Sequence, residues 1–299
     1  MNLDIGLVGY GEVGKIFASG LKEKTGRWIG AWDLKFADHA TRDAECAHAA
    51  ANGIEACASA AALCGKANLI ISAVTASNTL AVAQEVARSI RPGTLFLDLN
   101  SASPGTKTQC AALIDAAGGH YVEAGVMTSV PPYGIKVPML LGGARAAELA
   151  GVLTGWGMDA TAVAEKIGVA SAIKMCRSVM IKGLEAIVIE SYTTARAYGV
   201  EEQMIPTLYE TFPGIDWNKQ GAYFFSRVAQ HGKRRAEEMR EAANTVLEAG
   251  FTPYMAEAIA EKHDWVAQQS RAGVFAGLAK DVGWQDYADR LLQQSRQDK

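Results

Sequence analysis

The sequence lacks an excess of charge of either sign, and it lacks paired cysteines. Its 299 residues include 29 Lys and Arg against 32 Asp and Glu, so the formal net charge is −3. No basic field is present to hold nucleic acid or an anionic membrane surface, and we expect neither as a partner. The five cysteines are odd in number and contain no C-x-x-C pair, which argues against a disulfide framework or a zinc ribbon. We therefore expect buried, reduced thiols.

Long apolar runs are also missing. The best candidate, residues 179–189, is interrupted by Lys182 and Glu185 and falls short of the roughly 20 apolar residues that cross a membrane. The opening residues, MNLDIGLV, have no basic segment followed by an apolar core, so we expect no secretory leader. These absences predict a cytoplasmic protein. The five histidines show no ligand spacing, so no metal site is expected.

What is present is the composition of a globular protein, with 49% hydrophobic and 20% charged residues. At roughly 150 residues per domain, the length predicts about two domains. From residue 3 to about 165, short apolar runs alternate with helical patterns, which predicts an α/β fold with a parallel sheet and right-handed crossover helices. The expected strands cover 3–8, 28–32, 68–74, 94–99, 120–124, 138–141 and 158–163, and the helices cover 14–23, 81–90, 104–117 and 145–154.

The second half contains no convincing strand pattern. Residues 170–198 read as one long helix that is apolar almost all round between 179 and 189, as expected of a buried helix. Further helices are expected over 200–211, 226–249, 254–270 and 284–295, with a loop at 212–218. The sequence thus predicts a Rossmann-type domain over residues 1–166, followed by an all-α domain over 167–299.

A glycine-rich turn, GYGEVG at residues 9–14, follows the first strand and opens the first helix. In this pattern the first glycine permits a tight turn, the second lets the backbone approach a pyrophosphate, and the third lets helix and strand pack closely. The helix N-terminus then offers free N–H groups and a positive dipole end to the phosphates. The expected coenzyme contacts here are Gly9, Gly11, Glu12, Val13 and Gly14, with the Glu12 carboxylate directed to solvent.

Asp33 stands 19 residues after Gly14, at the end of the second strand. A carboxylate there can accept hydrogen bonds from the adenosine ribose, and it would repel a 2′-phosphate, so NAD is favoured. Lys35 and Arg42 lie nearby and leave NADP possible. Two other hypotheses remain. One is a glycine-rich turn whose role is packing alone. The other is a methyltransferase that binds S-adenosylmethionine, although in such enzymes the glycine-rich turn has another spacing and no helical second half follows.

Five segments together resemble the β-hydroxyacid dehydrogenase superfamily, which includes 3-hydroxyisobutyrate and 6-phosphogluconate dehydrogenases. Beside the glycine-rich turn, they are SAVT, DLNSASP (similar to D-x-S-T-x-x-P), EAGVMTS (similar to D-A-P-V-S-G-G) and the stretch from Gly168 through Lys174 to Ser178 (similar to G-x5-K-x3-N). The second half is similar to a subgroup with a poorly characterised helical C-terminal domain, through KMCRS, KGLEA and HGKRRAEEMREAA.

The resemblance implies that Lys174 is the catalytic lysine, which exchanges a proton with the substrate oxygen. Burial and a nearby nicotinamide cation would lower its pKa towards working pH. A solvated helix lysine is the alternative, and Lys182, two turns later, is the second choice. The resemblance also implies coenzyme contacts at Val74, Thr75 and Asn100, and substrate contacts at Ser101, Thr128, Ser129 and Ser178.

Two departures from the family pattern bear on the substrate. Ser178 replaces the asparagine that follows the lysine, and Met127, Thr128 and Ser129 replace the family's S-G-G loop, so the floor of the pocket differs in shape. Arg234 and Arg235 could bind a carboxylate or phosphate of the substrate. The alternative for both is a solvated helix face paired with the glutamates at 237, 238 and 241.

The favoured hypothesis is an NAD(P)-dependent dehydrogenase or reductase that moves hydride between the nicotinamide and a hydroxy-acid-like carbinol. Its small-molecule substrate would be acidic, and the nicotinamide would lie at the carboxyl ends of the strands, against the long helix. The apolar run at 179–189 has more surface than one small domain covers, which predicts a homodimer. The alternatives are an imine reductase, a decarboxylating sugar-acid dehydrogenase and a non-catalytic NAD-binding regulator.

Overall fold

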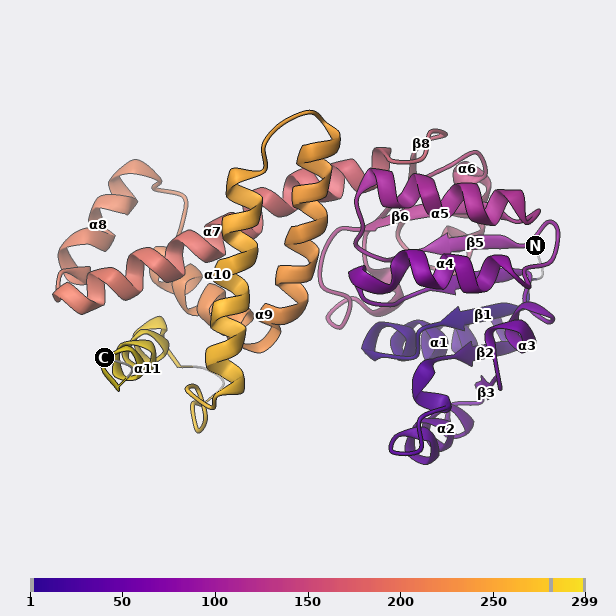
Figure 1. Cartoon of the computed structure of the whole chain (residues 1–299), viewed down its shortest axis with the longest axis horizontal. Helices are drawn as coiled ribbons and strands as arrows, with labels where there is room; N and C mark the ends of the chain where they lie inside the picture. The colour runs from indigo at the N-terminus through magenta and orange to yellow at the C-terminus, as the bar shows by residue number, and fades with distance from the viewer. Residues whose placement is uncertain (1–2, 280–281, 298–299) are drawn as a thin grey trace. The chain divides into compact units, whose positions relative to one another are not determined.

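The computed structural model of the protein describes residues 3–279 and 282–297 (Figure 1). Met1 and Asn2 lie outside the described residues. They belong to the N-terminal stretch for which the sequence predicts no secretory leader. The chain divides into two compact units, Met1–Met175 and Cys176–Lys299. The boundary expected at residue 166 lies just before the long helix, whereas this division falls inside that helix.

The first unit is built on an eight-stranded sheet in the order β3-β2-β1-β4-β5-β6-β7-β8. The strands are β1 Ile5–Val8, β2 Ile29–Trp32, β3 Glu55–Ala56, β4 Leu69–Ser72, β5 Leu95–Asp98, β6 His120–Val126, β7 Met139–Gly142 and β8 Ala160–Ala164. Every neighbouring pair is parallel except β6 and β7. The expected Rossmann-type α/β fold is confirmed.

Helices cover both faces of this sheet. They are α1 Glu12–Thr25, α2 Arg42–Ala51, α3 Ala60–Cys64, α4 Thr79–Ala87, α5 Pro104–Ala116 and α6 Ala146–Gly155. Alternate strand residues face opposite ways, so Leu7 packs with Phe17 of α1 in one apolar cluster, while Ile70 packs with Val86 of α4 in the other. Both faces of the central strands are therefore buried, which explains their continuous apolar runs.

Two parts of this unit differ from the sequence-based expectation. The expectation of an all-parallel sheet was wrong at β7, which runs antiparallel to β6, because residues 127–138 join the two strands without a full crossover helix. Residues 42–64 contain α2, β3 and α3, for which the sequence had predicted nothing. The apolar spacing of these alanine-rich segments is too weak to mark short elements.

The second unit is helical in its described residues. Its helices are the greater part of α7 Val169–Tyr198, then α8 Glu201–Thr211, α9 Trp217–Glu248, α10 Tyr254–Arg271 and α11 Trp284–Gln297. The loop expected over residues 212–218 is shorter, and α9 starts nine residues before the expected 226. The reason is that the Asp216 carboxylate caps this helix by accepting the Lys219 N–H.

The expectation that α7 is buried all round was wrong on one side. Met180, Ile181 and Ile187 are 67%, 39% and 53% exposed in the single chain. Lys182 and Glu185, the residues that interrupt the apolar run, are buried instead. They can be buried because each has an oppositely charged partner within the second unit.

The cysteines follow the expectation only in part. Cys57, Cys64 and Cys110 are buried, Cys46 is half-buried and Cys176 is exposed. Burial raises the pKa of the Cys57 and Cys64 thiols to about 11, so both stay protonated at neutral pH. Within residues 3–279 and 282–297, none of the helices combines the length and apolar character that a membrane crossing requires.

Candidate functional site

The glycine-rich turn lies between the end of β1 and the start of α1, and its three glycines meet three different demands. Gly9 has a φ of +97°, and a Cβ there would lie 2.3 Å from the Ala73 carbonyl oxygen. A Cβ on Gly14 would lie 2.0 Å from the Gly9 carbonyl oxygen. A Cβ on Gly11 would meet no described atom within 4 Å, so its backbone faces open space. The Gly11 backbone is therefore free to take a pyrophosphate, and the turn fits a dinucleotide.

Asp33 stands beside this turn, where the sequence placed it. Its carboxylate accepts the Tyr10 N–H at 2.6 Å and the Lys35 N–H at 2.9 Å, one on each oxygen. A carboxylate oxygen has two acceptor sites, so each keeps one for a ribose hydroxyl. The backbone bonds hold the carboxylate against the glycine-rich turn. Glu12 is exposed, as expected for a side chain directed to solvent.

The loops that follow β4 and β5 are joined by the side chain of Asn100. Its amide oxygen accepts the Val74 N–H at 2.7 Å, and its amide nitrogen donates to the Ser72 hydroxyl at 2.9 Å. A Cβ on Gly9 would also lie 2.8 Å from the Val74 side chain, so the glycine-rich turn touches the same loop. Thr75 is exposed beside it. The predicted coenzyme residues therefore form one continuous edge at the carboxyl ends of β1, β4 and β5.

Lys174 reaches this edge from α7. Its ammonium donates to the Ser101 hydroxyl at 2.6 Å, and Ser101 directly follows Asn100. The lysine is half-buried. A Cβ on Gly125 would lie 3.5 Å from Cβ of Lys174 and 2.9 Å from the Ala170 carbonyl oxygen, so the glycine lets β6 approach the first turns of α7 closely. The predicted catalytic lysine and the predicted substrate serine are thus direct partners.

The start of α7 is held by a buried carboxylate, Glu123 of β6. One of its oxygens accepts the N–H groups of Gly168 and Ala170 at 2.7 and 3.1 Å. The other accepts the N–H and the hydroxyl of Ser171 at 3.3 and 2.7 Å. Negative charge is favourable at a helix N-terminus, and four donors compensate its complete burial. Glu123 therefore fixes the first turn of α7, directly before the turn that contains Lys174.

A second buried network lies under the Asn100 loop. Asp98 accepts the Lys107 ammonium at 3.0 Å, the Tyr121 hydroxyl at 2.6 Å and the Asn100 N–H at 2.8 Å. The ammonium also donates to the Asp98 carbonyl at 3.1 Å, and both charged side chains are 1% exposed. Burial, followed by the Asp98 charge, raises the pKa of the Tyr121 hydroxyl well above its usual value. Tyr121 thus remains a hydrogen-bond donor at any pH of interest.

The sequence had given these buried polar residues no role. Glu123 and Asp98 belong to segments that resemble family motifs, but the resemblance implies no role for them. No sequence pattern marks Lys107 or Tyr121. The available signal was a carboxylate inside an otherwise apolar strand, because such a group is buried only with partners. Those partners come from up to 48 residues away, which no local pattern shows.

The remaining predicted substrate residues are spread over both units. Thr128 is exposed and Ser129 half-buried, in the segment after β6. Ser178 is buried and belongs to the second unit. Arg234, also in that unit, is exposed and pairs with Glu238 at 3.1 Å. The substrate roles of these four residues stay predictions.

Two basic residues of the second unit, Arg235 and Lys182, lie in environments that do not match the roles predicted for them. Arg235 is buried and makes a forked ion pair with Glu185, so it is neither part of a solvated face nor exposed to a ligand. Lys182, the second choice for the catalytic lysine, is buried against Glu238 at 2.7 Å. Desolvation lowers its pKa from the usual lysine value. Both side chains are engaged in ion pairs between helices.

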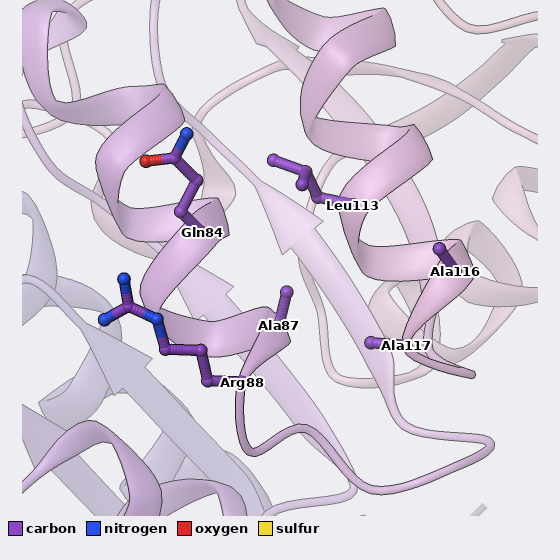
Figure 2. A pocket seen from close by; sticks show the side chains of 6 residues that line it. All are labelled: Gln84, Ala87, Arg88, Leu113, Ala116 and Ala117. Atoms are coloured by element: carbon purple, nitrogen blue, oxygen red, sulfur yellow. The ribbon is translucent and has the colours of Figure 1, made fainter.

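A surface hollow of about 570 Å³ lies between α4 and α5, as Figure 2 shows. Gln84, Ala87 and Arg88 line it from one side, and Leu113, Ala116 and Ala117 from the other. Both helices begin near the carboxyl ends of the strands, and the lining residues lie in or just after their C-terminal halves. The hollow therefore lies towards the amino ends of the strands. It is therefore at the wrong edge for the glycine-rich turn and Lys174.

Two families match the chain. Residues 4–147 match the family described as the NAD binding domain of 6-phosphogluconate dehydrogenase. Residues 195–266 match a domain of unknown function, DUF1932. The first match covers the glycine-rich turn, Asp33 and the Asn100 loop, and the second covers the end of α7, all of α8 and α9, and most of α10.

Solved structures match the chain over nearly its full length. A conserved hypothetical protein from Sinorhizobium meliloti 1021 is 38% identical over 98% of this chain and 97% of its own, with a TM-score of 0.78. The 3-hydroxyisobutyrate dehydrogenase of Mycobacterium tuberculosis, solved with L-serine, is 17% identical over 97% and 99%, with a TM-score of 0.71. A reductive aminase from Aspergillus terreus, solved with NADPH4, cyclohexanone and allyl amine, is 17% identical over 97% and 100%, with a TM-score of 0.57. The last two likenesses show the fold alone.

Proposed function

Because the chain belongs to the 6-phosphogluconate dehydrogenase-like group of β-hydroxyacid dehydrogenases, with a DUF1932 second domain, we propose that it oxidises or reduces a small hydroxy-acid-like carbinol with Lys174 as general acid and base. The observation that carries the proposal is the 2.6 Å bond from the Lys174 ammonium to the Ser101 hydroxyl. This pair lies at the same sheet edge as the glycine-rich turn and Asp33. A proton-transfer group and a dinucleotide-binding surface therefore meet within the first unit.

The nicotinamide, when bound, supplies or accepts the hydride. Gly9, Gly11, Val13 and Gly14 would hold the pyrophosphate through the turn and the start of α1, and Asp33 would bind the adenosine ribose. Val74, Thr75 and Asn100 would line the path towards the nicotinamide. Because the carboxylate at position 33 opposes a 2′-phosphate, the proposal favours NAD over NADP.

Lys174 performs the proton step. In oxidation, the neutral amine takes the hydroxyl proton as the carbinol C–H bond gives up its hydride; in reduction, the ammonium returns the proton to the oxygen. Ser101 directs the amine and is itself within reach of a substrate oxygen bound there. Thr128 and Ser129, which stand where the family has glycines, would supply hydroxyls to the substrate carboxylate. Glu123 keeps the lysine in place by holding the start of α7.

The test is a Lys174→Met variant. We expect it to bind NADH as the wild type does and to lose about 10²- to 10⁴-fold in turnover, as the loss of a general acid or base does. Turnover would be followed by NADH absorbance on a panel of 3-hydroxy acids and their keto acids. Lys166→Met, which removes an exposed lysine eight residues earlier, is the matched control and should keep full turnover. Equal turnover in both variants would exclude Lys174 from the chemistry.

Imine reduction is the second candidate, since the Aspergillus terreus reductive aminase shares the fold. That reaction needs a proton donor but not a lysine, so the Lys174–Ser101 pair favours the carbinol substrate. A panel that adds cyclic imines to the hydroxy acids separates the two. A non-catalytic regulator would bind NADH and turn over neither class, and a decarboxylating enzyme would release CO2 from a sugar acid.

The proposal includes a homodimer. A single chain leaves Met180, Ile181 and Ile187 on α7 partly exposed, and burying the rest of each would gain part of the about 1.5–3 kcal/mol that full burial of such a side chain is worth. A second copy packed on this side would complete the burial that the apolar run predicted. Light scattering at micromolar concentration should give twice the mass of the chain. A monomeric mass would contradict this part of the proposal.

A further inference from the structure

Glu45 of α2 forms an ion-pair cluster with two lysines beside Asp33. Its carboxylate lies 2.7 Å from the Lys15 ammonium and 3.8 Å from the Lys35 ammonium, with one oxygen towards each. Glu45 is half-buried, with 16% of its side chain exposed. The hydrogen bond from Lys15 lowers the pKa of Glu45, so the carboxylate is charged at neutral pH. One anion therefore engages two cations.

The cluster borders the predicted adenosine site on two sides. Lys15 is the residue after Gly14, and its ammonium lies 5.7 Å from the centre of the Tyr10 ring inside the glycine-rich turn. Lys35 donates its backbone N–H to Asp33, the residue that would bind the ribose. Tyr10 donates its own N–H to the same carboxylate. Lys35 is thus bonded directly to the group that would face the 2′-position of the ribose, and Lys15 lies by the ring of Tyr10, a residue whose backbone is bonded to that same group.

A 2′-phosphate would need these lysines. It carries close to two negative charges at neutral pH, and coenzyme sites that accept it place cations near the 2′-position. The charges of Asp33, Glu45, Lys15 and Lys35 sum to zero, so this cluster by itself offers the phosphate no net attraction. NAD has a plain hydroxyl at that position and is indifferent to how the lysines are paired.

We propose that Glu45 acts together with Asp33 in setting the coenzyme preference: it keeps Lys15 and Lys35 in ion pairs and away from a 2′-phosphate, so that the chain selects NAD. The inference rests on the proposed function, because it assumes that a nicotinamide dinucleotide binds at the glycine-rich turn. Glu45 itself need not touch the coenzyme. It acts by occupying the two ammonium groups that would otherwise face the phosphate, and it is therefore a specificity-determining residue.

The experiment measures the Kd of NADH and of NADPH for the full chain and for Glu45→Gln by calorimetry. The substitution keeps the size of the side chain and removes its charge, which leaves a net charge of +1 around the ribose. We expect the ratio of the NADPH Kd to the NADH Kd to fall at least about tenfold, since charge-assisted hydrogen bonds to phosphate are worth that much. The NADH Kd should change little.

Two further variants identify the cause. Lys15→Met and Lys35→Met, made together in the Glu45→Gln background, should return the ratio to its wild-type value. Glu55→Gln is the matched control, because Glu55 also pairs with a lysine, Lys66 at 2.6 Å, but on β3 and without any contact to Asp33 in the described residues. The fall in the Kd ratio caused by Glu45→Gln should also be smaller at 500 mM salt than at 50 mM, because salt screens interactions between exposed charges.

The outcomes separate the two proposals. If the wild type binds neither coenzyme, the dehydrogenase proposal fails and the Glu45 proposal falls with it. If the wild type binds NADH but the ratio is unchanged in Glu45→Gln, only the Glu45 proposal is overturned. The same holds if Glu55→Gln shifts the ratio equally, or if the wild type already binds NADPH as tightly as NADH.

Discussion

Both units bury charged side chains, but they place them differently. In the first unit, Lys107 and Asp98 lie under the Asn100 loop, and Asp98 bonds to Asn100 of that loop, to Lys107 of α5 and to Tyr121 of β6. In the second unit, Glu185 and Arg235 join α7 to α9. His263 of α10 approaches the same carboxylate at 3.7 Å. The first network shapes a site edge, whereas the second ties helices together.

The two networks also differ in how completely they are satisfied. Asp98 accepts one ammonium, one hydroxyl and one N–H. Within the described part of the second unit, neither ring nitrogen of His263 has a hydrogen-bond partner, although the side chain is fully buried. A buried polar group without a partner costs free energy, so the second network gives up stability that the first retains. Four substitutions test this comparison, two in each unit.

The largest effect is expected from Glu185→Ala. It leaves the Arg235 guanidinium buried without its anion, and removal of one partner of a buried ion pair costs about 3–5 kcal/mol. Urea unfolding followed by tryptophan fluorescence would measure the loss, because Trp217 and Trp284 are buried in the second unit. Glu190→Ala on the same helix removes an exposed partner of Lys262 and should cost less than about 1 kcal/mol. Equal losses would remove the distinction between buried and surface pairs.

Asp98→Asn should follow, with a loss of about 3 kcal/mol, because the Lys107 ammonium then faces a neutral amide in a buried place. NADH affinity is a second readout for this variant, because the Asp98 carboxylate also accepts the Asn100 N–H. We expect weaker NADH binding in Asp98→Asn and unchanged binding in Glu185→Ala while that variant is folded. Asp159→Asn, at an exposed aspartate, is the control for the charge change. Unchanged NADH affinity in Asp98→Asn would show that this network does not support the site.

The third effect depends on pH. Burial, and then the charges of Arg235 and Lys182, lower the pKa of His263 to about 3. Glu238 acts in the opposite direction. The unfolded chain takes up a proton on this histidine below its usual pKa of about 6.5, whereas the folded chain does not, so stability is full above that value and falls as the pH drops towards 3.

Between pH 7 and pH 5 the contribution of His263 to this loss is about 2 kcal/mol. The measurement is the urea midpoint as a function of pH in the wild type and in His263→Gln, which cannot titrate. The wild-type midpoint should fall relative to that of the variant as the pH drops. Parallel curves would show that His263 titrates alike in the folded and unfolded states.

The smallest effect is expected from Tyr121→Phe. It removes one hydrogen bond to the charged Asp98 and keeps the ion pair with Lys107, so the loss should be about 1.5 kcal/mol. The midpoint of thermal unfolding is a sufficient readout. Tyr133→Phe removes a hydroxyl from a half-exposed ring and serves as the control, with no measurable change expected. A loss as large as that of Asp98→Asn would mean that the hydroxyl, and not the ammonium, compensates Asp98.

Most of the fold could be predicted from the sequence because its signals are local. The apolar runs of β1, β4 and β5 lie between turns, and the observed strands end within two residues of the predicted ones. The short elements α2, β3 and α3 could not be predicted, since α2 is rich in alanine and has one buried residue. The reversed direction of β7 depends on how residues 127–138 close, which periodicity does not show.

The positions of the candidate site residues could be predicted where a sequence motif contains the residues themselves, while their roles stay predictions. The glycines of the turn, Asp33 and Lys174 lie as their motifs require, and Lys174 meets Ser101 directly. The supporting groups were missed because their partners are distant in sequence. Glu123 binds residues 168–171, and Glu45 binds Lys15 from a helix that was not predicted. Charge pairing of this kind becomes visible only when the chain is folded.

The carboxylate of Glu123 has one more consequence. The amides at the start of a long helix are a common receptor for phosphate or carboxylate ligands, and in α7 three of them already bind an internal anion. An acidic substrate cannot displace a buried carboxylate that is part of the fold. The negative group of the proposed acidic substrate would therefore be recognised elsewhere, and the hydroxyls and amides of the loops after β5 and β6 make these loops places where a change of substrate would be selected.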